Sequence, residues 1–451
     1  MEDLFLDVAK RANRYVGGLA GRNVSPTSQA IERLTLLDVP LQNEPIAPAK
    51  VLAELDEIAS PATVASTCGR YFGFVIGGCL PAAMAANMLA SVWDQNAGLG
   101  AASPVAAVLE VICLKWLISV LGLPANAGAG FVTGATSANF TCLAAARHAL
   151  LARESWDVEA DGLFGAPPIT VIVGEEVHVS VLKALSMLGL GRDRVVRLPV
   201  DGQGRMRGDA LPELTGPTIV CIQAGNVNTG AFDPADEICR IARESGAWVH
   251  VDGAFGLWAL ASPPRAHLAQ GISDADSWAT DAHKWLNVPH DSGVAFVREP
   301  RHLRAAMSTS AAYLIVGAGR EPCHYVPELS RRARGIEVWA ALRSLGRSGL
   351  ADLIERTCAR ATQFAEGLRA AGHAVLNDVV LNQVLVSFGS GEQTRRVIRR
   401  VQEDGTCWCG GTEWQAQAAM RISVSGWATT EDDVERSLAA ILRIAGEETD
   451  G

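Results

Sequence analysis

The chain has no basic run with interleaved aromatic residues and no long apolar stretch free of charge. Its formal net charge is −10, which argues against a nucleic-acid-binding surface. The most apolar long stretch, residues 105–123, is interrupted by Glu110 and Lys115 and therefore favours a buried helix over a membrane span. We expect neither a nucleic acid nor a membrane as a partner.

The first residues do not resemble a secretory signal, because they are amphipathic and carry acids early. The ten cysteines are scattered, as is typical of a protein from a reducing cytoplasm. Cys407 and Cys409 are the closely spaced pair, but no second Cys/His pair accompanies them. We predict a cytoplasmic protein without a metal site and leave the role of this pair open.

The hydrophobic content of 49% over 451 residues is typical of a soluble globular enzyme with two or three lobes. Residues 1–65 are predicted to be a helical segment, residues 66–334 a large domain and residues 335–451 a small α+β domain. In the large domain, short Val- and Ile-rich strands alternate with helices, which indicates an α/β fold with a mixed, mostly parallel sheet covered on both faces. The expected strands read GFVTG, ITVIVG, TIVCIQ, AWVHVDG, DSWATD and GVAFV.

One strand–helix–strand unit ends at a carboxylate. In FDPADEICRIARESGAW we predict Asp233 as the helix N-cap, Pro234 at the first helical position and Gly246 as a left-handed C-cap. The following strand carries Asp252 at its C-terminal end, where open α/β sheets bind ligands.

A lysine follows the next expected strand, in the segment DSWATDAHKWLNVPHDSG. Most single lysines are solvated surface residues. However, a strand-end carboxylate and a lysine in a nearby polar loop are what pyridoxal phosphate (PLP) chemistry needs. Lys284 would hold the aldehyde as a Schiff base, and Asp252 would keep the pyridine nitrogen protonated.

Two further features have both a structural and a functional interpretation. The segment GAGFVTGATSAN suggests a strand, a tight turn and a helix start, where Thr136 and Ser137 either cap the helix or hold a phosphate. Its glycine spacing, G-x-G-x-x-x-G, does not match a dinucleotide-binding fingerprint. His178 lies between a strand and a helix, either as a capping or core residue or stacked on a cofactor ring.

The sequence resembles the group II PLP-dependent amino acid decarboxylases, the aromatic amino acid and glutamate decarboxylases of the aspartate-aminotransferase fold (fold type I). The resemblance runs from about residue 66 to the C-terminus. It is carried by YFGFVIGGCLPAAMAANMLAS, SPVAAVLE, GATSAN, GEEVHVSVLKA, GNVNTGAFDP, HVDGAFG, DAHKW and ELSRRARGIEVWAALRSLG.

The resemblance implies a homodimer with the active site at its interface. Lys284 would form the Schiff base, Asp252 would pair with the pyridinium nitrogen, and His178 would stack on the ring near the substrate carboxylate. The phosphate would contact Thr136, Ser137 and His283, and Ser330 would reach the phosphate in the partner subunit. The resemblance places three further residues at the cofactor: Asn226, Ala254 and Asp281.

The family protonates Cα with a tyrosine on a mobile loop, and Tyr313 stands in the matching place, followed by Gly317 and Gly319, which favour loop flexibility. Relatives with phenylalanine there tend toward oxidative deamination to aldehydes. Tyr313 therefore favours plain decarboxylation. The alternative is an exposed loop tyrosine without a catalytic role.

The resemblance assigns the substrate pocket to Phe74, Val75, Trp93 and Gly98. This mostly apolar wall favours an aromatic or bulky apolar L-amino acid. An acidic substrate is the alternative, with Arg70 as the nearby cation, and Arg421 is either a carboxylate ligand or part of a structural salt bridge. A PLP aminotransferase, a carbon–carbon lyase of the same fold and a non-catalytic interaction protein remain further alternatives.

Overall fold

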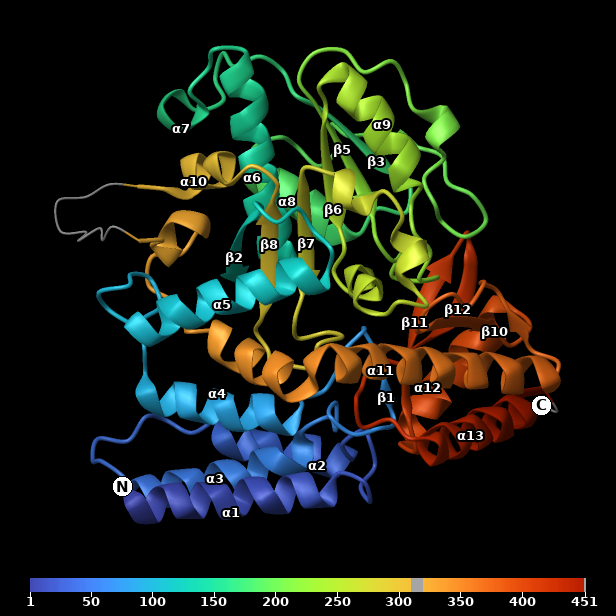
Figure 1. Ribbon diagram of the computed structural model, residues 1–451. Helices are drawn as coiled ribbons and strands as arrows, with labels where there is room; N and C mark the ends of the chain where they lie inside the picture. The colour runs from blue at the N-terminus through green and yellow to red at the C-terminus, as the bar shows by residue number, and fades with distance from the viewer. Residues whose placement is uncertain (310–318, 450–451) are drawn as a thin grey trace.

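The structure is a computed structural model that describes residues 1–309 and 319–449. A seven-stranded sheet of order β2-β8-β7-β6-β5-β3-β4 forms its centre (Figure 1). The strands β3 to β7 pair in parallel, whereas β8 is antiparallel to both β2 and β7. This confirms the predicted α/β fold with a mixed, mostly parallel sheet. The strands are β2 (Gly128–Val132), β3 (Thr170–Gly174), β4 (Val196–Leu198), β5 (Thr218–Gln223), β6 (Trp248–Asp252), β7 (Ser277–Asp281) and β8 (Gly293–Val297).

Helices cover both faces of this sheet. The strands β5 to β8 are therefore buried along their whole length. The helix α6 packs against β7, β8 and α8, whereas α5 lies on the other side, next to α11 (Figure 1). The helices of this part are α4 (Pro81–Trp93), α5 (Pro104–Val120), α6 (Ala135–Arg153), α7 (Val158–Asp161), α8 (Val179–Met187), α9 (Ala235–Ser245) and α10 (Pro300–Met307).

The chain ends flank this centre. At the N-terminus, α1 (Glu2–Gly18), α2 (Ser28–Glu32) and α3 (Pro48–Ala59) lie below α4 in Figure 1. At the C-terminus, a five-stranded sheet of order β1-β11-β12-β10-β9 carries α12 (Gly391–Asp404) and α13 (Glu431–Thr449). Its strands are β1 (Tyr71–Phe72), β9 (Ala374–Val375), β10 (Gln383–Ser387), β11 (Trp408–Trp414) and β12 (Gln417–Ser423). The pairing of β1 with β11 draws residues of the expected large domain into this sheet.

The predicted N-cap of α9 is wrong. The helix begins at Ala235, with Pro234 at the N-cap position and no side-chain cap. The Asp233 carboxylate instead accepts hydrogen bonds from the backbone N–H groups of Met206 and Gln223, both at 2.7 Å. Burial raises the pKa of Asp233 to about 6. The predicted left-handed cap at Gly246 is confirmed, with φ 71° and ψ 15°.

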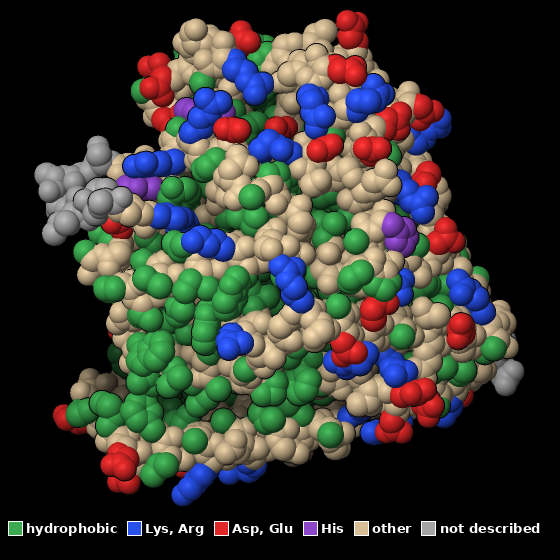
Figure 2. All heavy atoms as spheres, in the orientation of Figure 1, with side chains coloured by type: hydrophobic (Ala, Val, Ile, Leu, Met, Phe, Trp, Pro, Cys, Tyr) green, Lys and Arg blue, Asp and Glu red, His purple; other side chains and the backbone are tan. Residues whose placement is uncertain are grey.

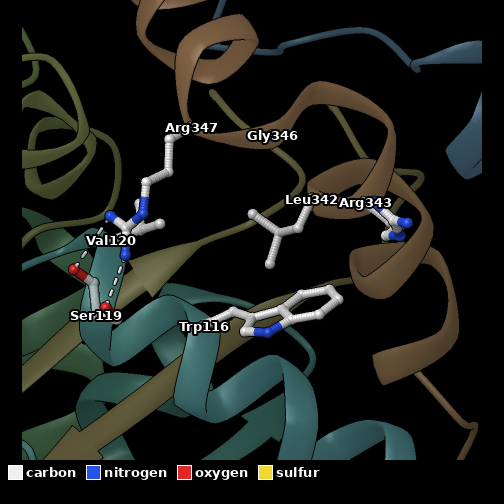
Figure 3. A pocket seen from close by; sticks show the side chains of 7 residues that line it. All are labelled: Trp116, Ser119, Val120, Leu342, Arg343, Gly346 and Arg347. Carbon is white, nitrogen blue, oxygen red and sulfur yellow. Dashed lines mark hydrogen bonds between the residues drawn. The ribbon is translucent and has the colours of Figure 1, made fainter.

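A long helix, α11 (Gly335–Ala370), connects the two sheets and is broken at Gly346, whose φ of 61° and ψ of −174° are not helical. A cavity of about 250 Å³ lies between this break and α5. Figure 3 shows Trp116 and Leu342 facing each other across it, while Arg347 reaches the Ser119 hydroxyl at 2.7 Å. The glycine permits a backbone conformation that other residues rarely adopt.

One face of the molecule exposes apolar side chains. Figure 2 shows hydrophobic side chains gathered over α4 and α5, at the lower left. The exposed residues of this apolar face are Met84, Met88, Leu89, Val92 and Trp93 on α4, and Val105 and Val108 on α5. Within the described parts of the chain, no helix has the length and apolar character needed to cross a membrane.

Candidate active site

A cavity at the C-terminal ends of β5 and β6 brings together several of the predicted functional residues. Lys284, Asp252, His178 and Ala254 all contribute to its wall. The remaining lining residues are Gln223, Gly225, Val227 and Phe255. The parallel strands deliver these side chains to one edge of the sheet, as the crevice rule for α/β folds predicts.

Asp252 is almost completely buried and is held by three neutral donors. Its Oδ2 accepts from the Asn139 side-chain amide at 3.2 Å and from the Ser180 hydroxyl at 3.3 Å. Its Oδ1 accepts from the backbone N–H of Ala254 at 3.2 Å. A carboxylate has about four lone-pair positions, so one acceptor position remains for a further donor.

His178 is the N-cap of α8 and is joined to the same group. Its Nδ1 accepts from the backbone N–H of Ser180 at 3.3 Å and lies 2.7 Å from the Ser180 hydroxyl oxygen. Burial lowers the pKa of His178 below its usual value, and the charges of Lys284 and Arg421 lower it further. Burial therefore favours the neutral form of the ring.

Lys284 is partly buried and is paired with Asp281, the last residue of β7. The Nζ atom is 3.2 Å from Asp281 Oδ2. The other carboxylate oxygen, Oδ1, accepts from the backbone N–H of Ala135 at 2.6 Å. Asp281 thus ties the lysine to the first residue of α6.

The first turn of α6 carries Thr136 and Ser137. Its N-cap residue, Gly134, has no side chain to cap the helix, and the Asp281 carboxylate binds the N–H of Ala135. The hydroxyls of Ser137 and Thr133 are 2.7 Å apart. The first N–H groups of a helix lack intrahelical partners and carry partial positive charge, so this end of α6 suits an anion.

His283 lies beside this helix start. Its Nδ1 accepts from the backbone N–H of Ser292 at 3.1 Å, and its Nε2 is 3.7 Å from Asp281 Oδ1. Burial lowers the pKa of His283. Its ring stacks on that of His290, with centroids 4.3 Å apart.

Asn226 is buried next to the cavity but is not among the residues that line it. Its Oδ1 accepts from the backbone N–H of Asn228 at 2.8 Å, as in a tight turn. Its Nδ2 has no hydrogen-bond partner among the described residues. A contact between Asn226 and the cofactor stays a prediction.

Phe74 and Val75 lie in the loop after β1, both with positive φ values of 53° and 61°. The Phe74 ring is exposed and stacks on Trp408, whereas Val75 is buried in the main core. The same loop touches the lysine segment, because a Cβ on Gly77 would lie 1.6 Å from the carbonyl oxygen of Lys284. The loop that carries Phe74 and Val75 therefore packs directly against the backbone of Lys284.

Trp93, Gly98 and Ser330 do not line the Lys284 cavity. Trp93 ends α4 on the apolar face. Gly98 and Ser330 line a separate cavity of about 250 Å³, where Asn96 Nδ2 donates to the Ser330 hydroxyl at 3.1 Å. Their roles toward substrate and the partner's phosphate stay predictions, as does the role of Tyr313, which lies outside the described residues.

Two arginines are candidates for carboxylate binding, and they have different partners in the structure. Arg70 is buried and donates to the carbonyl oxygens of Thr406, Ala20 and Arg22. It is therefore not available to an acidic substrate, which corrects that expectation. Arg421 donates to Asn228 Oδ1 at 3.3 Å, and no carboxylate among the described residues pairs with it.

Sequence reasoning missed Asn139 and Ser180, which hold Asp252. Asn139 is part of the GATSAN motif and stands one helical turn after Thr136, so helical periodicity offered a signal. The proximity of Ser180 to Asp252 depends on how α8 packs against the sheet, and the sequence carries no direct signal for it.

The family of the chain follows from comparison with known proteins. The pattern described as "Pyridoxal-dependent decarboxylase conserved domain" matches residues 31–389. The chain belongs to this family. It is a carboxy-lyase that uses PLP to decarboxylate an amino acid.

Several characterised relatives are similar to this decarboxylase. The aromatic-L-amino-acid decarboxylase of Drosophila lebanonensis is 30% identical over 377 residues, which cover 77% of this chain and 91% of the relative. That of Bacillus atrophaeus is 26% identical, covering 80% of this chain and 76% of the relative.

Two solved structures have the same fold. The structure of Oryza sativa TDC with PLP and tryptamine has a TM-score of 0.91 at 22% identity, covering 99% of this chain and 97% of that chain. Mouse CSAD in its apo form also has a TM-score of 0.91 at 22% identity, with 98% of each chain covered.

The residues present fit PLP. An amine and a strand-end carboxylate face one cavity, and the start of α6, whose N-cap residue is a glycine, lies next to the lysine segment. Among the described residues, the buried Asn226 Nδ2 and Ser292 Oγ have no hydrogen-bond partner. Polar atoms of this kind indicate that a polar ligand belongs here.

Proposed function

We propose that this decarboxylase acts on an L-amino acid with an aromatic or bulky apolar side chain and releases the amine and CO₂. The cavity lining carries this proposal. Among the described residues that line the cavity, Lys284 is the one cation, so no second cation there would pair with an acidic side chain. Val227 and Phe255 supply apolar wall instead. Arg70, the nearby alternative for an acidic side chain, is engaged by backbone carbonyls.

Some of the relatives' names agree with this class of substrate. Aromatic-L-amino-acid, tryptophan and tyrosine decarboxylases among them support it. A histidine decarboxylase and an acidic amino acid decarboxylase are also similar to this chain and do not. A screen of CO₂ release over the twenty L-amino acids, DOPA and 5-hydroxytryptophan tests the proposal. Turnover confined to aspartate, glutamate or a similar acid would refute it.

The proposed roles of the cofactor-binding residues follow from their contacts. Bound PLP supplies a conjugated pyridinium ring that accepts the electron pair left when CO₂ departs. Lys284 would bind its aldehyde, Asp252 would accept a hydrogen bond from the ring nitrogen, and His178 would pack on the ring. Thr136, Ser137 and His283 would bind the phosphate, with Asp281 holding the lysine segment against α6.

Arg421 is proposed to bind the α-carboxylate of the incoming amino acid. Its guanidinium is largely buried and lacks an acidic partner among the described residues, and burial lowers its pKa. A buried cation of this kind is stabilised by an anion. Arg421→Gln should lower kcat/KM by about 10- to 150-fold on every substrate, since one charge-assisted hydrogen bond contributes about 1.5–3 kcal/mol.

The same arginine favours a second candidate function, decarboxylation of an acidic amino acid through its side-chain carboxylate. In that case Arg421→Gln would impair turnover of the acidic substrate and leave the slow turnover of aromatic amino acids unchanged. Arg421→Lys, which keeps the charge but not the two-pronged geometry, is the matched control.

Tyr313 is proposed to return a proton to Cα, which would favour amine over aldehyde. The proteins similar to this chain include a phenylacetaldehyde synthase and a 4-hydroxyphenylacetaldehyde synthase, whose names indicate an aldehyde product. In the presence of O₂ as oxidant, Tyr313→Phe should reduce amine and raise aldehyde, with release of ammonia and reduction of O₂ to hydrogen peroxide. Unchanged amine output from this variant would remove Tyr313 from the mechanism.

We further propose that two copies of the chain form a homodimer through the apolar face of α4 and α5. Contiguous apolar surface of this kind is typical of an interface. Leu89→Glu should give monomers in sedimentation velocity, whereas Phe164→Glu, at a position 99% exposed elsewhere, should not. Dimers in both variants would place the interface elsewhere.

A cytoplasmic location is proposed because all ten cysteines are free thiols and nine of them are buried. Fractionation of cells that express the full-length protein, with immunoblotting, tests this location.

A further inference from the structure

A line of hydrogen bonds runs through the protein behind Asp252, away from the cavity. The Trp248 indole Nε1 donates to the Ser277 hydroxyl at 2.9 Å. His250 Nδ1 lies 2.9 Å from the same hydroxyl, and His250 Nε2 lies 2.9 Å from Asn139 Oδ1. Asn139 then donates to Asp252 Oδ2. All five side chains are buried.

The direction of every bond in this line is fixed by its two ends. An indole N–H can only donate and an ionised carboxylate can only accept. Asn139 therefore turns its amide nitrogen to Asp252 and its oxygen to His250. His250 must then carry its hydrogen on Nε2 and accept on Nδ1, and Ser277 donates to that Nδ1 while it accepts from Trp248.

A neutral His250 is required for this arrangement, because a charged imidazole would present two N–H groups. The ring is completely buried, and burial lowers its pKa to about 4. At neutral pH the ring therefore has one donor and one acceptor, as the line needs.

We propose that Trp248, Ser277, His250 and Asn139 form a one-directional hydrogen-bond chain that positions Asp252 and favours its charged form for the cofactor's ring nitrogen. This inference rests on the proposed role of Asp252. The chain fixes the side-chain torsion of Asp252 through Oδ2 and keeps every donor hydrogen pointing toward the carboxylate. Bonds to the charged form favour that form, and aligned hydrogen bonds polarise one another. The four residues are positioning residues, since they act through Asp252.

The test compares two cofactors on the full-length apoenzyme. PLP has the ring nitrogen, whereas 1-deazapyridoxal phosphate has a C–H in its place. Wild-type protein should bind PLP more tightly by about 10- to 150-fold, the value of one charge-assisted hydrogen bond. His250→Phe, which keeps the ring shape but can neither donate nor accept, should reduce this preference about tenfold. His250→Gln, which can do both, should restore most of it.

A matched pair of tryptophans separates the proposal from a general effect on the sheet. Trp248→Phe removes the first donor of the chain. Trp278→Phe removes an equally buried indole on the neighbouring strand, whose Nε1 donates to the Ile272 carbonyl and not into the chain. The first change should reduce the preference for PLP, whereas the second should not. If His250→Phe does not fold, the comparison of Trp248→Phe with Trp278→Phe still tests the proposal.

The outcomes distinguish a failure of the hydrogen-bond chain from a failure of the proposed role of Asp252. If Asp252→Asn removes the preference but the His250 and Trp248 variants retain it in full, the chain has no positioning role and the inference is wrong. If Asp252→Asn also retains the preference, the proposed role of Asp252 itself fails. Equal loss of affinity for both cofactors in the His250 variant would show a structural role alone, which also contradicts the inference.

Discussion

Mild acid is expected to destabilise this decarboxylase through His250. Burial lowers the pKa of His250 in the folded state to about 4, whereas an exposed histidine titrates near 6.5. Between these values the unfolded chain binds a proton that the folded chain does not. The contribution of neutral His250 to stability is therefore complete above pH 6.5 and is lost as the pH falls toward 4.

The magnitude follows from the two pKa values. Each unit of difference corresponds to 1.36 kcal/mol, so the full effect is about 3 kcal/mol, of which about 2 kcal/mol is lost by pH 5. The main physical cause is burial of the ring, which disfavours its charged form. In addition, protonated His250 would direct a second N–H at the Ser277 hydroxyl, which already accepts from Trp248.

Urea unfolding at pH 7.5 and pH 5.0, at one protein concentration, measures this effect in the wild type and in His250→Gln. The wild type should lose about 2 kcal/mol more than the variant between the two pH values. His302, whose pKa burial also lowers to about 4, is present in both proteins and cancels in the difference. An equal loss in both proteins would refute the assignment of this pH dependence to His250.

Two further predictions concern stability. Gly346→Ala should lower the free energy of unfolding by about 1–3 kcal/mol in urea titrations, because alanine is strained at its φ of 61°; Gly446→Ala in α13, where the added Cβ meets nothing, should not destabilise. Glu110→Gln should cost about 3–5 kcal/mol, since buried Glu110 pairs with buried Arg331 and with Arg320. A melting temperature unchanged by Glu110→Gln would contradict this second estimate.

The central sheet was predictable because its strands are short, apolar and separated by turn residues. The six expected strands are all present, and Asp252 and Lys284 share one cavity as the strand-end argument required. Local capping signals also succeeded where both partners are close in sequence. Thr430 and Asp433, three residues apart, exchange side-chain-to-backbone hydrogen bonds at the start of α13.

The failures involve partners that are distant in sequence. Asp233 has the composition of an N-cap, but two backbone N–H groups of other segments bind its carboxylate instead. The strand β11 contains Gly410 and Gly411, which weaken its strand signal. The two residues of β1 form a strand only because β11 lies beside them, more than 330 residues later.

The two strand-end carboxylates of the site differ in their partners, and this difference separates their chemistry. Asp281, at the end of β7, is compensated by the Lys284 ammonium. Asp252, at the end of β6, is equally buried but is held by an amide, a hydroxyl and a backbone N–H, and no cation among the described residues pairs with it. A buried carboxylate without a cationic partner is unfavourable for the fold alone. The neutral donors do not offset the charge of its carboxylate, so a protonated ring nitrogen would be stabilised at Asp252 and not at Asp281.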